Sequence, residues 1–196
     1  MAELLFIEGA KLENGATLPS VKAYAGDILW VETENDLYSD VFVSLLLGLS
    51  KPKKGVFKFF NSNVSYCDVS EWLPQIKKVS SLCRAYAYSK GNHISACVNN
   101  VRKLLGGANA GYAFDMDIQK MAKSTRVMMS WAITMSVPAL NIILNNPYYG
   151  MDKNASLFVS SEIEGAAKDG SLVIIVSHEK PPVFSKQISF TTGKNK

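Results

Sequence analysis

Cysteine and histidine are scarce in this chain of 196 residues. Cys67, Cys83 and Cys97 are far apart in the sequence and form no CxxC pair and no even-numbered disulfide framework. A reducing compartment is therefore expected, with all three cysteines in structural roles. His93 and His178 have no neighbours at metal-ligand spacing, so no metal site is expected. A Gly-x-Ser-x-Gly elbow is also absent, which argues against a serine hydrolase.

A concentration of charge of one sign is also missing. Lysine and arginine number 21, aspartate and glutamate number 17, and the formal net charge is +4. The basic residues form only small clusters, at positions 51–54, 77–78 and 194–196. A nucleic-acid-binding face usually needs a denser basic stripe or an aromatic-basic motif. We therefore expect a solvated surface and no nucleic-acid partner.

Long apolar runs are few. The N-terminal residues lack a basic region followed by a sustained apolar region, so no signal peptide is expected. Residues 127–144 form a charge-free run close to the lower length limit for a spanning helix. Pro138 interrupts this run, and residues 142–144 have the pattern of a short strand. The run therefore predicts a buried helix followed by a buried strand, without a direct membrane span.

The apolar residues that are present, 47% of the chain, are enough for the core of one domain spanning residues 1–196. Strands alternate with helices, and the central strands are apolar throughout, which predicts a three-layer α/β domain. A less regular helical stretch predicts a subdomain inserted at about residues 85–135. The expected strands lie within residues 2–25 and at 27–32, 56–60, 76–82, 141–144, 172–177 and 186–192. The expected helices are residues 40–49, 93–105, a helix capped by Ser124 that runs to 135, and 154–168.

Four segments, in this order, resemble the ATP-binding subunit of ABC transporters. Residues 26–29 are similar to the strand before its phosphate loop, and residues 45–55 to the helix end and turn after that loop. Residues 142–152 resemble the second nucleotide motif, and residues 172–179 resemble the strand that carries the switch histidine. The small subunit of haem-exporter or cytochrome c maturation systems has the most similar layout. The resemblance implies a P-loop NTPase-like sandwich of the ABC ATPase type, with an antiparallel edge sheet.

The phosphate loop implied by the resemblance lacks the residues that bind phosphate. Such a loop needs glycines whose backbone N–H groups point inward, a lysine for the phosphates and a hydroxyl for Mg²⁺. Thr33 and Tyr38 stand at the framing glycines, Ser39 at the lysine and Asp40 at the hydroxyl, and Asp36 adds a further acid. Like charges 4 Å apart repel by about 4 kcal/mol at an effective dielectric constant of 20. A helix N-terminus offers an anion only about 0.3–1 kcal/mol, so no tight ATP binding is expected.

The second nucleotide motif shows a parallel loss. Asn145 and Asn146 stand where the family has its metal-associated aspartate and its catalytic glutamate, and an amide is neither an anionic ligand nor a general base. Residues 121–125, at the position of the glycine-rich signature, contain no glycine. His178 and Asp152 match family positions that contact the γ-phosphate and the dimer interface. Without the other groups, we expect His178 to be a hydrogen-bonding residue at the end of a strand. We expect Asp152 to be a turn residue or a helix N-cap.

These correlated losses predict an ATPase-inactive, ABC-like subunit without a cofactor. The resemblance implies a membrane-embedded subunit or an ABC-type ATPase subunit as partner, in a homodimer or heterodimer, at the cytoplasmic face of a membrane. The alternative is a soluble scaffold in a non-transport assembly. Asp152 and several aromatic residues are candidates for the interface, although such aromatic spacing also fits a core. The aromatic candidates are Trp72, Tyr86, Tyr88, Tyr112 and Phe114.

Overall fold

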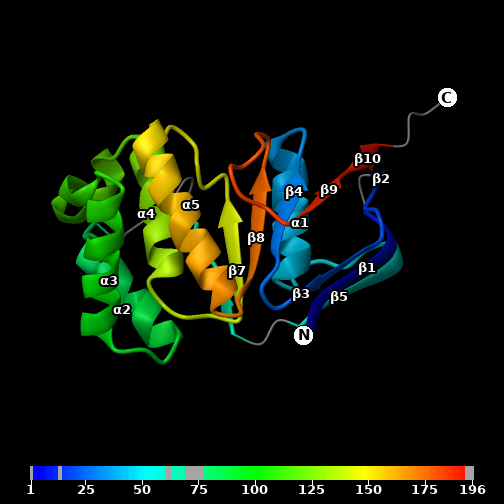
Figure 1. Ribbon diagram of the computed structural model, residues 1–196, viewed down its shortest axis with the longest axis horizontal. Helices are drawn as coiled ribbons and strands as arrows, with labels where there is room; N and C mark the ends of the chain where they lie inside the picture. The colour runs from blue at the N-terminus through cyan, green and yellow to red at the C-terminus, as the bar shows by residue number, and fades with distance from the viewer. Residues whose placement is uncertain (1, 13–14, 61–62, 69–76, 193–196) are drawn as a thin grey trace.

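A parallel sheet forms the centre of the computed structural model, which describes residues 2–12, 15–60, 63–68 and 77–192. Each of its strands runs parallel to its neighbours, as a βα-alternating sequence requires. Figure 1 shows helices on both faces of this sheet, with the second sheet beyond one of these faces. The strand order is β6 (Val64–Ser65), β7 (Asn141–Asn145), β8 (Leu172–Ser177), β4 (Ile28–Glu32) and β9 (Lys186–Ser189).

A second, antiparallel sheet is built around β1 (Glu3–Lys11), which pairs with three other strands. Gly55 lies where β5 meets an irregularity in β1, at φ +80°, and a Cβ atom there would be 2.3 Å from the carbonyl oxygen of Gly9. Only glycine fits such a close backbone approach. The partners of β1 are β2 (Ala16–Thr17), β3 (Val21–Tyr24) and β5 (Lys54–Phe59), and β10 (Thr191–Thr192) pairs with β2.

The helices cover the parallel sheet on both faces. Residues alternate along each strand: Ile142, Val173 and Ile175 belong to one hydrophobic core, whereas Ile143 and Ile174 belong to the other. The first core also contains α4 (Lys123–Met135), α5 (Lys153–Lys168), α2 (Val79–Ser89) and α3 (Ile94–Gly107), and the second contains α1 (Asp36–Leu46) and the antiparallel sheet. Two short 3₁₀ helices, η1 (Gly111–Asp115) and η2 (Ile118–Lys120), connect α3 to α4. The predicted three-layer α/β class is confirmed.

Most predicted elements are present, and four differ. The strand expected at residues 76–82 is wrong, because Val79, Leu82, Cys83 and Tyr86 form the buried face of α2, at helical spacing. Helix α1 begins at Asp36, four residues earlier than expected. The N-cap of α4 is Ala122, with no side-chain capping bond, in place of Ser124. The last predicted strand is two strands, β9 and β10, in different sheets. The inserted subdomain at residues 85–135 stays a prediction.

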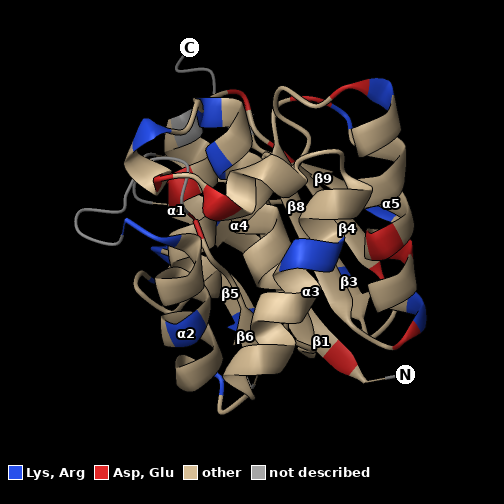
Figure 2. Cartoon of the chain, turned by 90° about the vertical axis from the view of Figure 1, so that its left-hand side faces the viewer, with Lys and Arg blue, Asp and Glu red and all other residues tan. Residues whose placement is uncertain are grey.

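The charge-free run at residues 127–144 falls within α4, a connecting segment and β7. Within the described residues, no helix has both the length and the apolar character needed to cross a membrane. The expectation of a buried helix followed by a buried strand is therefore confirmed. On the face that carries α2 to α5, acidic and basic residues are interspersed (Figure 2), and the residues described there form no extended stripe of one sign.

The three cysteines, distant in sequence, approach one another in the fold. Cys83 on α2 and Cys97 on α3 are fully buried, and the Cys97 Sγ lies 3.2 Å from the Ser136 Oγ. A hydrogen bond to the Cys97 thiol and burial together raise the pKa of the Cys83 thiol. Burial, followed by the negative charge of Asp68, raises the pKa of the Cys67 thiol to about 12. The fold thus favours the neutral form of Cys83 and Cys67.

The pKa of Cys67 predicts a loss of stability in alkali. An unfolded thiol ionises above its ordinary pKa of 9.0, whereas folded Cys67 stays neutral up to about pH 12. The contribution is fully present below pH 9.0, and each pH unit above this value removes about 1.4 kcal/mol from the free energy of unfolding. Urea unfolding at about pH 8 and about pH 10 gives the free energy of unfolding at each pH. Between these two values it should fall by about 1.4 kcal/mol less in Cys67→Ser than in the wild type. An equal fall in both proteins would contradict the prediction.

Candidate functional site

A cleft of about 430 Å³ opens at the carboxyl ends of the parallel strands, where α/β folds commonly bind ligands. We call it the carboxyl-edge cleft. Helix α1, which follows β4, lines it, as do the residues that follow β7 and β8. The structure brings together here five residues singled out in the sequence: Ser39, Asp40, Asn145, Asn146 and His178. The segments that resemble nucleotide motifs therefore line one common cleft.

The segment that corresponds to the phosphate loop is already helical. Asn35 is the N-cap of α1, with extended backbone at φ −162°. Its side-chain oxygen accepts a hydrogen bond of 3.2 Å from the Tyr38 N–H. The Asn35 carbonyl accepts from the N–H groups of Tyr38 at 3.2 Å and Ser39 at 3.4 Å. Amides that a phosphate loop would turn toward its anion are thus engaged within the helix and its cap.

Thr33, Ser39 and His178 form one hydrogen-bonded group beside the cleft. Thr33 and Ser39 are buried, and their hydroxyl oxygens lie 3.0 Å apart. The His178 Nδ1 lies 2.8 Å from the Thr33 carbonyl oxygen, and because a carbonyl can only accept, Nδ1 carries the proton. The hydroxyl of Ser39 is therefore held at Thr33, and His178 is the hydrogen-bonding strand-end residue expected from the sequence.

The two asparagines after β7 belong to a polar network that includes Asp68. The Asn145 amide donates to an Asp68 carboxylate oxygen at 3.4 Å, and the Asn146 amide donates to the Asn145 side-chain oxygen at 3.4 Å. The Tyr66 hydroxyl donates to Asp68 at 3.2 Å. Burial raises the pKa of Tyr66 above its ordinary value, and the negative charges of Asp68 and Asp40 raise it further. Asp40 and Asp68 thus both bring negative charge to this end of the cleft.

Asp68 and Tyr66 are site residues that the sequence prediction missed. They follow β6, whose two residues are too few for a recognisable strand pattern. Parallel pairing of β6 with β7 places them beside Asn145. The family resemblance implies an order of strands in the sheet. This order does not identify the residues that follow a short edge strand.

The charges that line the carboxyl-edge cleft do not match a nucleoside triphosphate. Asp40, Asp68 and Glu179 contribute carboxylates, and Lys123 and Lys180 are the lysines among the described lining residues. Both ammonium groups lie over aromatic rings, each 5.3 Å from a ring centroid, Tyr149 for Lys123 and Phe184 for Lys180. Within the described residues, no group of three His, Cys, Asp or Glu side chains could hold a metal ion. The described lining thus has three carboxylates and two lysine ammonium groups, a balance that is unfavourable for the anionic phosphates of Mg-ATP.

Asp152 has the capping position predicted for it. Its side-chain oxygen accepts a hydrogen bond of 2.8 Å from the Ala155 N–H at the start of α5. An aspartate in this position also interacts favourably with the helix dipole. The prediction of a helix N-cap is confirmed, whereas a role for Asp152 at an interface stays a prediction.

The aromatic interface candidates lie in different environments. Tyr86 and Phe114 are buried in the core around α2 and α3, and the Tyr86 hydroxyl donates to the Ser65 hydroxyl at 3.0 Å. In contrast, Tyr88 is 84% exposed and Tyr112 is 64% exposed. Trp72 lies outside the described residues. An interface role for these aromatics stays a prediction, which Tyr88 and Tyr112 could fulfil without rearrangement of the core.

Comparison of the sequence with known proteins gives one distant relative. No family model matches the sequence. An ABC transporter ATP-binding protein of Clostridium tetani (strain Massachusetts / E88) is 22% identical over 173 residues, which cover 82% of this chain and 39% of that protein. The chain thus spans about two fifths of the length of this curated relative.

Solved structures match the fold over nearly the whole chain. The ATP-binding subunit of an ABC transporter has a TM-score of 0.74 and 14% identity, over 89% of this chain and 79% of its own. An ABC transporter ATP-binding protein from Pyrococcus furiosus has a TM-score of 0.76 and 14% identity, over 96% of this chain and 97% of its own. The chain therefore has the fold of ABC transporter ATP-binding domains, and the resemblance to that subunit family, predicted from four segments of sequence, is confirmed.

Proposed function

We propose that this chain is an ATPase-inactive ABC-type subunit that serves as a structural or regulatory component of a membrane-associated, transporter-like complex. The observation that carries the proposal is the start of α1. The backbone amides of Tyr38 and Ser39 are bonded to Asn35, so they are not directed toward a phosphate. Because α1 begins at Asp36, the open glycine loop of a phosphate cradle is replaced by helix.

The side chains at the cleft support the same proposal. Ser39 carries no charge for the phosphates, and Asp40 adds repulsion where a magnesium-binding hydroxyl would be needed. Asn145 and Asn146 cannot act as general bases toward water, because an amide has no basic form at neutral pH. Asn145 is also hydrogen-bonded to Asp68. In our proposal, the carboxyl-edge cleft thus has neither the side chains that bind the phosphates of ATP nor those that support its hydrolysis.

A chain that has this fold without the groups for ATP binding and hydrolysis would act through contacts with other proteins. ABC ATP-binding subunits pair with membrane subunits, and we infer such a partner, or an ABC-type ATPase subunit, for this chain. Tyr88 and Tyr112 are large, exposed aromatic side chains, a residue type enriched in interface hot spots. The proposed location is peripheral, at the inner face of a membrane.

Affinity purification of the tagged chain from its own cells in mild detergent tests this function. A membrane subunit or an ABC-type ATPase subunit should co-purify with the chain. Double substitution Tyr88→Ser and Tyr112→Ser should reduce its recovery at least about tenfold, the effect of losing an interface hot spot. Leu157→Ser is the matched control, because Leu157 is 57% exposed on α5. Recovery of soluble partners alone would favour a scaffold in a non-transport assembly, and equal loss in both variants would contradict the proposed surface.

A further inference from the structure

A second cleft, of about 540 Å³, lies at the opposite edge of the parallel sheet, near the amino ends of β7 and β8. We call it the amino-edge cleft. Asn100 of α3, Met135 at the end of α4, residues 136–140, and Glu162 and Gly165 of α5 form most of its walls. Among the segments that resemble nucleotide motifs, Ile142, the first residue of the 142–152 segment, is the one described residue that lines this cleft. The size is within the usual range of ligand pockets.

Two helices end at this edge. Helix α5 connects the parallel strands β7 and β8, and therefore runs antiparallel to them, while α4 leads directly into β7 (Figure 1). The carbonyl end of a helix carries about half a negative charge. The C-caps, Ser136 of α4 and Asp169 of α5, both line the amino-edge cleft. The backbone alone thus makes this edge electronegative.

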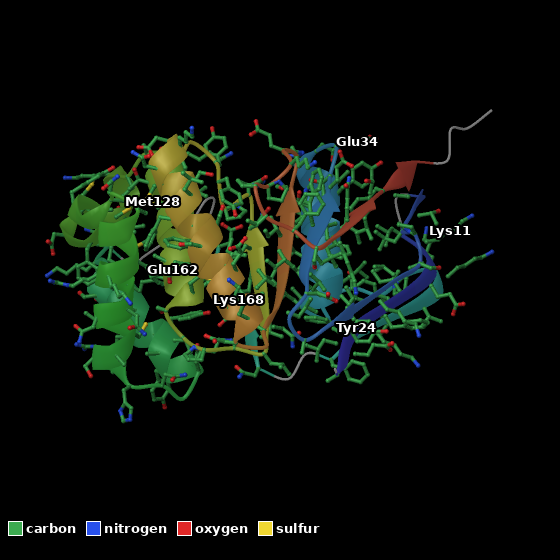
Figure 3. The ribbon with its side chains drawn as sticks, in the orientation of Figure 1. Lys11, Tyr24, Glu34, Met128, Glu162 and Lys168 are labelled. Atoms are coloured by element: carbon green, nitrogen blue, oxygen red, sulfur yellow. The ribbon has the colours of Figure 1, made fainter. Side chains whose placement is uncertain are left out.

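The side chains add to the negative potential. Glu162 and Asp169 line the amino-edge cleft, and neither forms a salt bridge with a described residue. No lysine or arginine is found among its lining residues in the described part of the chain. Lys168, in the last turn of α5, is not a lining residue; Figure 3 labels Glu162 and Lys168 along this helix. A cation entering the cleft therefore meets two carboxylates and two helix C-termini.

The rest of the lining combines apolar side chains with a few polar side chains, and hydrogen bonds fix part of it. The Asn100 amide donates to the Ser136 carbonyl oxygen at 2.8 Å, and the Ser171 hydroxyl donates to the Ala139 carbonyl oxygen at 2.7 Å. These bonds hold the segment between α4 and β7 at both ends, so the cleft is preformed and binding does not have to order it. The apolar lining residues are Met135, Val137, Pro138, Leu140, Ile142 and Ala166.

We propose that the amino-edge cleft binds a short segment of a partner protein that carries an arginine beside apolar side chains. The guanidinium group pairs with Glu162 and Asp169, since its planar fork matches carboxylate geometry. The neighbouring apolar side chains contact Met135, Pro138 and Leu140. Charge complementarity selects this occupant, because an acidic segment would face two carboxylates and two negative helix ends at once.

Titration of the full chain with three short peptides, followed by backbone amide NMR shifts, tests the proposal. The peptides are acetyl-Leu-Arg-Leu-amide and its Gln and Glu counterparts. The Arg peptide should bind at least about tenfold more tightly than the Gln peptide and shift the amide signals of Gly165 and Gly170. Equal affinity of the three peptides, no binding of the Arg peptide, or equally tight binding of arginine amide alone would overturn the proposal.

Variants distinguish binding in the amino-edge cleft from non-specific electrostatic attraction. Glu162→Gln with Asp169→Asn should lower the affinity for the Arg peptide about tenfold. Glu164→Gln is the matched control, because Glu164 is exposed on the same helix and does not line the cleft. A Cβ atom at Gly165 would meet nothing within 4 Å, so Gly165→Phe should extend into the cleft and block the peptide without disturbing the core. An equal effect of Glu164→Gln, or unchanged binding by Gly165→Phe, would also overturn the proposal.

Discussion

Mg-ATP at about 5 mM is expected to leave the thermal unfolding midpoint of this chain unchanged. A ligand at one hundred times its dissociation constant stabilises a protein by about 2.7 kcal/mol. For a chain of this size such a gain raises the midpoint by about 5–10 °C. Here no gain is expected, because the amides of Tyr38 and Ser39 are held by Asn35 and because Asp40 and Asp68 bring negative charge to the cleft. Thermal scans and calorimetric titration measure the result.

Two variants test whether the side-chain charges alone prevent nucleotide binding. Ser39→Lys restores a positive charge but leaves the helical start at Asp36, so it should still not bind Mg-ATP. Asp40→Asn combined with Asp68→Asn removes two carboxylates and should also fail, because the backbone amides stay engaged. Inorganic tripolyphosphate provides the same test without the base and sugar. Binding of Mg-ATP by the wild-type chain at micromolar concentration would contradict both this prediction and the proposed inactivity.

The central strands could be predicted because a short run of apolar residues between turn residues is typical of a buried parallel strand. The Ile28–Glu32 and Leu172–Ser177 strands are apolar on both faces, as a parallel strand between two helical layers must be. The turns around them carry asparagine, glycine and proline, which set the boundaries. The antiparallel strands of the first 25 residues were also predicted, since turn residues separate short alternating segments.

The start of α1 could not be predicted from the family resemblance. The resemblance places a loop where the structure has helix from Asp36. The local signal was present, because an asparagine followed by helix-compatible residues is a typical N-cap sequence. The resemblance instead implies the outline of a phosphate loop for this segment, which hides the capping role of Asn35. Asn35 decides the direction of the Tyr38 and Ser39 amides, because its side chain and its carbonyl group accept their hydrogen bonds.

Sequence spacing also could not separate buried from exposed aromatics. Tyr86 and Tyr88 are two positions apart on α2, so they lie on opposite sides of a helix with 3.6 residues per turn. One is buried against Ser65 and the other is exposed. With residues 76–82 predicted as a strand, the phase of this helix was unknown. Contacts such as Cys83 with Cys97 likewise depend on how α2 packs on α3.

Phe42→Ala is expected to cost about 3–5 kcal/mol of unfolding free energy, the usual range for removing a fully buried phenylalanine. Phe42 is completely buried on α1. Its ring centroid lies 6.0 Å from that of Phe57 on β5 and 6.0 Å from that of Phe190, with T-shaped geometry in both pairs. Phe42 therefore joins α1 to the antiparallel sheet and to the C-terminal strands. Loss of the ring leaves a cavity where three parts of the fold meet.

Urea and thermal unfolding of Phe42→Ala measure this effect, with a midpoint expected about 10 °C below that of the wild type. Leu37→Ala is the matched control, since Leu37 is 60% exposed on the same helix and its loss should change stability by less than about 0.5 kcal/mol. A loss below about 1 kcal/mol in Phe42→Ala would mean that the two sheets do not depend on this contact. Because Ser39 and Asp40 belong to the helix that Phe42 anchors, the same contact positions one wall of the carboxyl-edge cleft. The proposed structural role requires a stable fold, and Phe42 stabilises it where α1 meets the antiparallel sheet.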